Sequence, residues 1–169
     1  AVSAGRQAGA LRSSDFVHLH NHSQYSLLDG LTKIPALVKH VKDQGMDAVA
    51  VTDHGTMSGA IEFYKEAKAA GVQPIIGMEA YIAPRKHTDK EPEKDRQYFH
   101  LTMLAMNQQG YQNLMRLATI GNLDGFYYRP RIDRDLIKKY SEGLLVLSGC
   151  MGSEVSDALR QGQYEQAKK

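Results

Sequence analysis

Apolar and β-branched runs alternate along this chain with segments in which apolar residues recur at helical spacing. Five runs are predicted to be strands, at 16–21, 47–53, 73–83, 98–106 and 143–149. Each run is followed by a helix-like stretch or by a turn. Because strands that alternate with helices are typical of βα units, the pattern predicts an α/β fold with a mainly parallel sheet.

The clearest helix lies between the first two strand candidates. Its apolar residues Ile34, Leu37, Val38 and Val41 follow the i, i+3, i+4, i+7 spacing of one buried helix face. Gly45 stands just after them, where a left-handed residue commonly ends a helix. We therefore predict one buried face and a glycine terminus for this helix.

The remaining helices are predicted from their caps and periodicity. Ser58 is expected to cap a second helix that ends at Gly71. Its inward residues are expected to be Ile61, Tyr64 and Ala67, and those of a third helix Tyr111, Leu114, Leu117 and Ala118. Asp133 is expected to cap a short fourth helix, and 153–169 to form a fifth. The polar segment 84–97, interrupted twice by proline, is predicted to be an exposed excursion.

The composition is that of a globular, cytoplasmic domain. The chain has 169 residues, of which 42% are hydrophobic, and no apolar run approaches the roughly 18 residues of a membrane span. The single cysteine, Cys150, excludes an internal disulfide and fits a reducing compartment. Residues 1–14 lack periodicity and are predicted to be a disordered extension, which leaves 15–169 as the domain. The net charge of +2 comes from Arg6 and Arg12, so charge alone does not indicate a nucleic-acid partner.

Every predicted strand places a chemically competent side chain at or near one rim of the sheet. His18, His20 and His22 alternate along the first run and would share one face of a strand. The later runs carry a metal-competent residue each, and these residues are His54, Glu79, His100 and Cys150. Imidazole, carboxylate and thiolate together suit zinc, manganese or iron. We therefore predict a metal site, against the alternative of unrelated polar groups.

Three histidines receive other interpretations. His40, beside two lysines on the first helix, and His87, in the charged excursion, are predicted to be solvated surface residues. His22 sits past the expected strand end, where a supporting hydrogen bond or a phosphate contact is as plausible as metal ligation. The sequence leaves that choice open.

Several segments resemble one known family. They are "HLHNHSQYSLLDG", "VTDHGTMSGAIEFYKEA", "PIIGMEAYIAP", "FHLTMLAMN" and "LSGC". In these segments the chain is similar to the PHP (polymerase and histidinol phosphatase) metal-dependent phosphoesterases. The stretch "GYQNLMRLATIGNLDGFYYRPRIDRDLI" narrows the resemblance to the PHP domains at the N-terminus of bacterial replicative DNA polymerase III alpha subunits.

The resemblance implies a fold and a ligand set. The family fold is a distorted seven-stranded β/α barrel that binds up to three divalent ions, zinc or manganese, and this chain would be about its first five βα units. By similarity, His18 and His20 are ligands of one ion, and Glu79 bridges to a second ion that His100 and Cys150 complete. Asp29 and His54 resemble ligands of a third, and the family's late Asp-x-His pair has no counterpart after Cys150.

The resemblance also implies an activity. It points to hydrolysis of the terminal phosphodiester of a mispaired primer, 3′ to 5′, by a metal hydroxide, within a DNA-directed DNA polymerase that works with primer-template DNA and replisome subunits. Glu79, His54 and Asp29 would carry the catalysis, and His22, Arg129 and Arg131 would contact the substrate. Two alternatives remain open, a non-catalytic metal-stabilised scaffold and a free-standing phosphatase of the histidinol phosphate type, and the isolated chain is expected to be inactive.

Overall fold

A ten-residue strand, β2 (Gln73–Ile82), lies at the centre of a six-stranded mixed sheet in the computed structural model, which describes residues 15–27 and 29–168. The predicted extension at 1–14 lies outside the described residues. The other strands are β1 (Ala48–Val51), β3 (Phe99–Ala105), β4 (Phe126–Tyr127), β5 (Arg129–Ile132) and β6 (Leu144–Leu147). The helices are α1 (Ile34–Asp43), α2 (Ala60–Ala70), α3 (Pro92–Asp95), α4 (Gln108–Leu123), α5 (Arg134–Lys139), α6 (Glu154–Arg160) and α7 (Tyr164–Ala167).

The sheet is mixed, so the expectation of a mainly parallel sheet is wrong. Its order is β4-β5-β2-β3-β6, and β1 also pairs with β2. β1 and β5 run parallel to β2, whereas β3 runs antiparallel to both β2 and β6. A parallel neighbour needs a long crossover, and the segment between β2 and β3 holds only the four-residue α3. β3 therefore returns beside β2 in the opposite direction.

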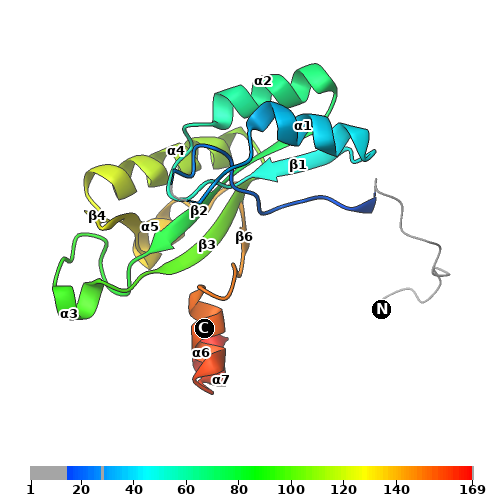
Figure 1. Cartoon of the computed structure of the whole chain (residues 1–169). Helices are drawn as coiled ribbons and strands as arrows, with labels where there is room; N and C mark the ends of the chain where they lie inside the picture. The colour runs from blue at the N-terminus through cyan, green and yellow to red at the C-terminus, as the bar shows by residue number, and fades with distance from the viewer. Residues whose placement is uncertain (1–14, 28, 169) are drawn as a thin grey trace.

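The segment 16–21 is not a strand, contrary to the prediction. It forms a single isolated bridge, between His18 and Val49 of β1. Two further polar contacts hold it there, since the backbone N–H of Thr52 donates to the carbonyl of Asn21 and the Asn21 amide donates to the carbonyl of Ala50. The segment thus follows β1 without forming a regular ladder, as the blue ribbon beside β1 shows (Figure 1).

Two apolar clusters form the core. α1 and α2 cover β1 and bury the first cluster, which contains Ile34, Val38, Val41, Val49, Val51, Phe63, Ala67 and Val72. α4 covers β2 and β3 and buries the second, which contains Met78, Ala80, Ile82, Met103, Leu114, Leu117 and Ile132. The predicted buried face of the first helix is confirmed, and on the third helix Leu114, Leu117 and Ala118 pack inward as predicted, whereas Tyr111 lines a surface groove. α6 and α7 extend from the end of β6, away from the sheet (Figure 1).

Several local predictions need correction. The N-cap of α2 is Gly59, because the Ser58 hydroxyl contacts Thr56 instead of the helix. Ile61 is 58% exposed and Tyr64 is 50% exposed, so neither points inward. Phe63 is the fully buried residue on this part of α2. In place of the single helix predicted at 153–169, the described residues form two short ones, α6 and α7. The predicted cap of the fourth helix is confirmed, since the Asp133 carboxylate accepts from the N–H of Leu136 in α5.

No helix in the described residues is both long and apolar enough to span a membrane.

The excursion 84–97 is only partly exposed, because it folds around Asp95. The Asp95 carboxylate is fully buried and accepts from Arg85 Nε at 2.9 Å and Arg85 Nη2 at 2.6 Å. It also accepts from the backbone N–H of Glu91 at 2.8 Å. These contacts, with the Arg85 hydrogen bonds as the largest effect, lower the pKa of Asp95 to about 2.

This depressed pKa predicts an acid-dependent loss of stability. The contribution of the Asp95 carboxylate is complete above its unfolded pKa near 4 and is lost as pH falls towards about 2. We expect Asp95→Asn to be less stable than wild type at pH 6 and the gap to close below pH 3, in urea unfolding at a series of pH values. The exposed Asp124→Asn serves as control, and a gap that stays constant with pH would contradict the assignment.

Candidate metal centre

Strand alternation turns one face of the sheet towards α4 and the other towards the candidate site. Met78 and Ala80 of β2 point into the cluster beneath α4, so Glu79, between them in sequence, points to the opposite face. The antiparallel register sets Glu79 opposite Thr102 and Tyr81 opposite His100. Glu79 and His100 therefore share the face that α4 leaves uncovered.

The register of β1 against β2 brings His54 to Glu79. β1 pairs in parallel with the first part of β2, and an isolated bridge in the same register joins His54 to Glu79. Gly55 then turns the chain with a φ of 62°, and a β-carbon there would lie 2.5 Å from the Pro130 ring. Glycine is therefore required directly after His54.

A buried carboxylate anchors the loop that carries His20 and His22. Asp53, 2% exposed, accepts from the backbone N–H of Ser23 at 2.6 Å and from its hydroxyl at 2.7 Å. The hydroxyl of Ser26 accepts from the N–H of His54 at 2.9 Å. These contacts tie the loop to the end of β1 and so bring its two histidines to the sheet face.

Four imidazoles surround the carboxylate of Glu79, which is 1% exposed. The nitrogen to oxygen distances from Glu79 are 2.6 Å to His20, 3.0 Å to His22, 2.9 Å to His100 and 3.5 Å to His54. Two overlapping groups, His20–His22–Glu79 and His54–Glu79–His100, each have ligand atoms within 4.8 Å of one another. One carboxylate thus connects two candidate ligand sets.

Asp29 and Cys150 border this cluster. Asp29 Oδ2 lies 2.9 Å from His54 Nε2, on the ring nitrogen that points away from Glu79. Cys150 Sγ lies 3.8 Å from His100 Nδ1 and 3.9 Å from Glu79 Oε1. The two side chains extend the donor set with a carboxylate on one side and a thiol on the other.

The crowded imidazoles perturb each other's protonation. Burial alone raises the pKa of Glu79, but hydrogen bonds from His100, His22 and His20 outweigh it and hold that pKa far below its usual range. A hydrogen bond to Glu79 raises the pKa of His22. Burial lowers the pKa of His54, whose ring stacks on that of His22 at 4.2 Å. Glu79 is therefore an anion among imidazoles.

These residues fit divalent metal ions. His22 Nδ1 and His54 Nδ1 are buried ring nitrogens without a hydrogen-bond partner. A buried polar atom without a partner is costly, and a metal ion would accept the lone pair of a neutral imidazole. Imidazole nitrogen, carboxylate oxygen and thiolate sulfur together are ligands for zinc, manganese or iron.

The histidines outside the centre are placed differently from one another. His18 belongs to neither ligand group, and its ring packs edge-on against Phe16 at 4.8 Å. His40 is exposed on α1, as predicted. His87 is not a solvated residue, because its Nδ1 lies 2.6 Å from the buried carboxylate of Asp133. The excursion that carries His87 folds back on the start of α5, which the local sequence did not indicate.

The two arginines expected to contact substrate have different environments. Arg131 is fully buried, and its guanidinium donates to the carbonyls of Gly125, Asp95, His87 and Asp89. It has no surface to offer to DNA, which contradicts that part of the expectation. Arg129 instead lines a cleft of about 610 Å³ together with Asp29 and His54. Its buried Nε has no hydrogen-bond partner.

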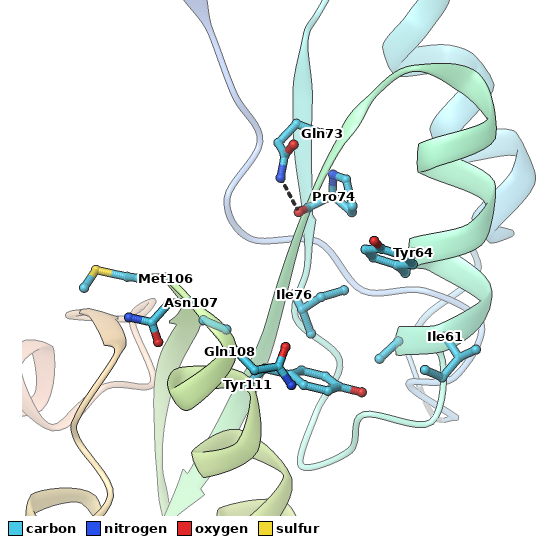
Figure 2. A pocket seen from close by; sticks show the side chains of 11 residues that line it. Ile61, Tyr64, Gln73, Pro74, Ile76, Met106, Asn107, Gln108 and Tyr111 are labelled. Carbon is cyan, nitrogen blue, oxygen red and sulfur yellow. Dashed lines mark hydrogen bonds between the residues drawn. The ribbon is translucent and has the colours of Figure 1, made fainter.

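A second groove, between α2 and the start of α4, lies apart from this chemistry (Figure 2). Its volume is about 460 Å³, and its lining contains no histidine, cysteine or carboxylate. Ile61 and Tyr64, expected inward, form one wall. The groove therefore explains their exposure without adding to the candidate centre.

The fold and the site define an α/β protein with a candidate metal centre built around a buried carboxylate. The family model for the PHP domain matches residues 18–169, and the chain belongs to that family.

The curated relatives are longer proteins. The chain is 49% identical over 156 residues to the DNA polymerase III subunit alpha of Borreliella burgdorferi, an alignment that covers 92% of this chain and 14% of the relative. It is 49% identical over 157 residues to the same subunit of Thermus aquaticus, covering 90% and 13%. Among solved structures, an amidohydrolase from Chromobacterium violaceum matches with a TM-score of 0.47 and 20% identity, over 63% of this chain and 33% of that one. The chain thus spans 13–14% of the length of these two alpha subunits.

Proposed function

We propose that this chain is part of the PHP domain of a replicative DNA polymerase alpha subunit, and that its metal centre removes nucleotides from a DNA primer in the 3′ to 5′ direction. The arrangement of four imidazoles around Glu79 is the observation that carries this proposal. The similarity to alpha subunits supports the polymerase context. In that context the chain acts in the cytoplasm on primer-template DNA, next to the rest of the polymerase and other replisome subunits.

The ligand roles follow from the two overlapping groups. His20, His22 and Glu79 would hold one zinc or manganese ion, and His54, Glu79 and His100 a second. Cys150 lies near enough to His100 and Glu79 to complete the second set. Asp29, beside His54 and half exposed, would take part in a third site at the mouth. His22 thus takes the place in the first set that the resemblance gave to His18.

Phosphodiester hydrolysis is the chemistry that suits this centre. Divalent ions in such a site activate water and stabilise the charge that grows on the phosphate oxygens. Glu79 would hold two ions close together, while Asp29 would orient His54 through their 2.9 Å contact. Arg129 lines the same cleft and would place its positive charge near a phosphate bound there.

The sheet itself supports a larger barrel. β6 stands at the end of the strand order, and Leu145 and Val146 on it are more than 40% exposed. An exposed apolar edge strand favours pairing with a further strand. We propose that β1 to β6 belong to a seven-stranded PHP barrel whose later strands would cover this edge, and that 15–169 is the first part of that domain.

The activity is tested on the complete gene product. A primer with a mispaired 3′ end is incubated with Mn²⁺ or Zn²⁺, with and without a chelator, and primer shortening is measured for wild type and Glu79→Gln. We expect chelation and Glu79→Gln each to lower the rate at least about a hundredfold. His40→Gln, on the exposed side of α1, is the matched control and should leave the rate unchanged.

Other outcomes select the alternatives. Bound metal without primer shortening would favour the metal-stabilised scaffold. Release of phosphate from histidinol phosphate, measured in parallel, would favour a small-molecule phosphatase. Shortening that neither chelation nor Glu79→Gln affects would overturn the proposal.

A further inference from the structure

Exposed aromatic rings surround the cleft that opens onto the candidate metal centre. Phe126 of β4 is 53% exposed and Tyr128 is 61% exposed. Both line the same cleft as His54, Asp29 and Arg129. Exposed apolar side chains that gather at one place mark binding sites more often than single ones do, and these two lie where a substrate of the metal centre would pass.

The backbone holds Tyr128 in an unfavourable conformation. In the described residues Tyr128 is the only non-glycine residue with a positive φ, at 60°. It lies at the tip of the hairpin in which Tyr127 pairs with Arg129. The ring of Tyr127 contacts that of Tyr128 at 4.7 Å and lies 5.1 Å from the buried Arg131 guanidinium. The hairpin thus anchors Tyr127 inward and presents Tyr128 outward, and such strain is typical of functional positions.

Two cations accompany the rings. The Arg96 guanidinium lies 5.9 Å from the Tyr128 ring, and that of Arg129 lies 5.8 Å from the Tyr81 ring. In the described part of the chain, neither guanidinium is found in an ion pair with a carboxylate. Interleaved rings and cations without a carboxylate partner are the combination that binds single-stranded nucleic acid, because rings stack on bases and cations contact phosphates.

We propose that Phe126 and Tyr128 stack on the unpaired terminal bases of a DNA strand, while Arg96 and Arg129 contact its backbone. This inference rests on the proposed function. It would make the centre act preferentially on DNA ends whose terminal bases are unpaired. In a duplex the base faces are already stacked, so the rings receive a base only after the end has unpaired. A mispaired end unpairs at lower cost and therefore reaches the metal centre more often.

Photo-cross-linking tests the stacking directly. A single-stranded oligonucleotide with 5-iodo-2′-deoxyuridine at its 3′ end is irradiated with the complete gene product in the presence of a chelator, and the cross-linked peptide is mapped by mass spectrometry. We expect cross-links at Phe126 or Tyr128. Because stacking on one ring is worth roughly 1–3 kcal/mol, removing a ring should lower the yield about tenfold.

The variants separate loss of the ring from loss of the fold. Tyr128→Gly removes the ring and suits the φ of 60°, so its thermal unfolding should be unchanged or improved. Tyr128→Phe should retain cross-linking, and Tyr164→Ala, which removes an exposed ring on α7, should leave it unchanged.

Two results would overturn the inference: cross-links that map only outside 126–129, or a yield that survives the combined Phe126→Ala and Tyr128→Gly changes. Covering of these rings by another part of the polymerase would give the first result. The proposed hydrolysis can fail while this inference stands. That result would be cross-linking at Tyr128 together with primer shortening that Glu79→Gln does not change.

Discussion

Replacing Glu79 by glutamine is expected to abolish the metal binding that we propose for this centre. Glutamine keeps the size of the side chain but has no charge, and only one of its terminal atoms is an oxygen. Both candidate ligand groups contain Glu79, so a single substitution weakens both. Loss of a residue that only supports a metal ligand lowers metal affinity about 10 to 100-fold, and loss of the carboxylate ligand itself should lower it further. We expect affinity to fall more than a hundredfold.

Metal titration against a chromophoric chelator measures this fall, and thermal unfolding provides a second readout. A ligand that binds only the folded chain raises Tm, so zinc should stabilise wild type and have little effect on Glu79→Gln. Glu66→Gln, an exposed change on α2, should behave as wild type. Equal affinities for Glu79→Gln and wild type would show that the carboxylate does not hold the metal.

The sequence predicted which side chains would meet at the candidate centre better than it predicted the strands and loops that bring them together. His54, Glu79, His100 and Cys150, one from each later run, were expected at or near one rim of the sheet, and in the structure the other three contact Glu79. The apolar runs that carry these residues are local features that periodicity reveals. His18 was grouped with them on the assumption of a strand at 16–21, and without that strand the alternation argument does not apply.

The supporting contacts were beyond sequence reasoning because they join residues that are distant along the chain. Asp53 follows β1 and reads as one more strand-end carboxylate, yet its function is to hold the loop through Ser23. The mixed topology was missed for a similar reason. The segment 84–97 folds beside the sheet through hydrogen bonds from the distant Arg131 to its carbonyls, and periodicity within 84–97 does not reveal these contacts.

Arg131 supports a second large effect, on stability. Its guanidinium is fully buried and joins the excursion 84–97 to Gly125 through backbone carbonyls. Burial lowers the pKa of Arg131, and the neighbouring Asp95 opposes this change. A planar group with five donors can satisfy several carbonyls at once, which a lysine ammonium cannot do in the same geometry.

Arg131→Met should therefore destabilise the chain by about 3–5 kcal/mol, because methionine fills similar space but leaves these buried carbonyls without donors. Urea unfolding measures the change, and Arg134→Met, which removes an exposed partner of Glu154, should change stability by less than about 1 kcal/mol. Arg131→Lys should fall between wild type and Arg131→Met. Equal stability of Arg131→Met and Arg134→Met would contradict this prediction. It would mean that water replaces the guanidinium at every carbonyl and that 84–97 folds onto the sheet without Arg131.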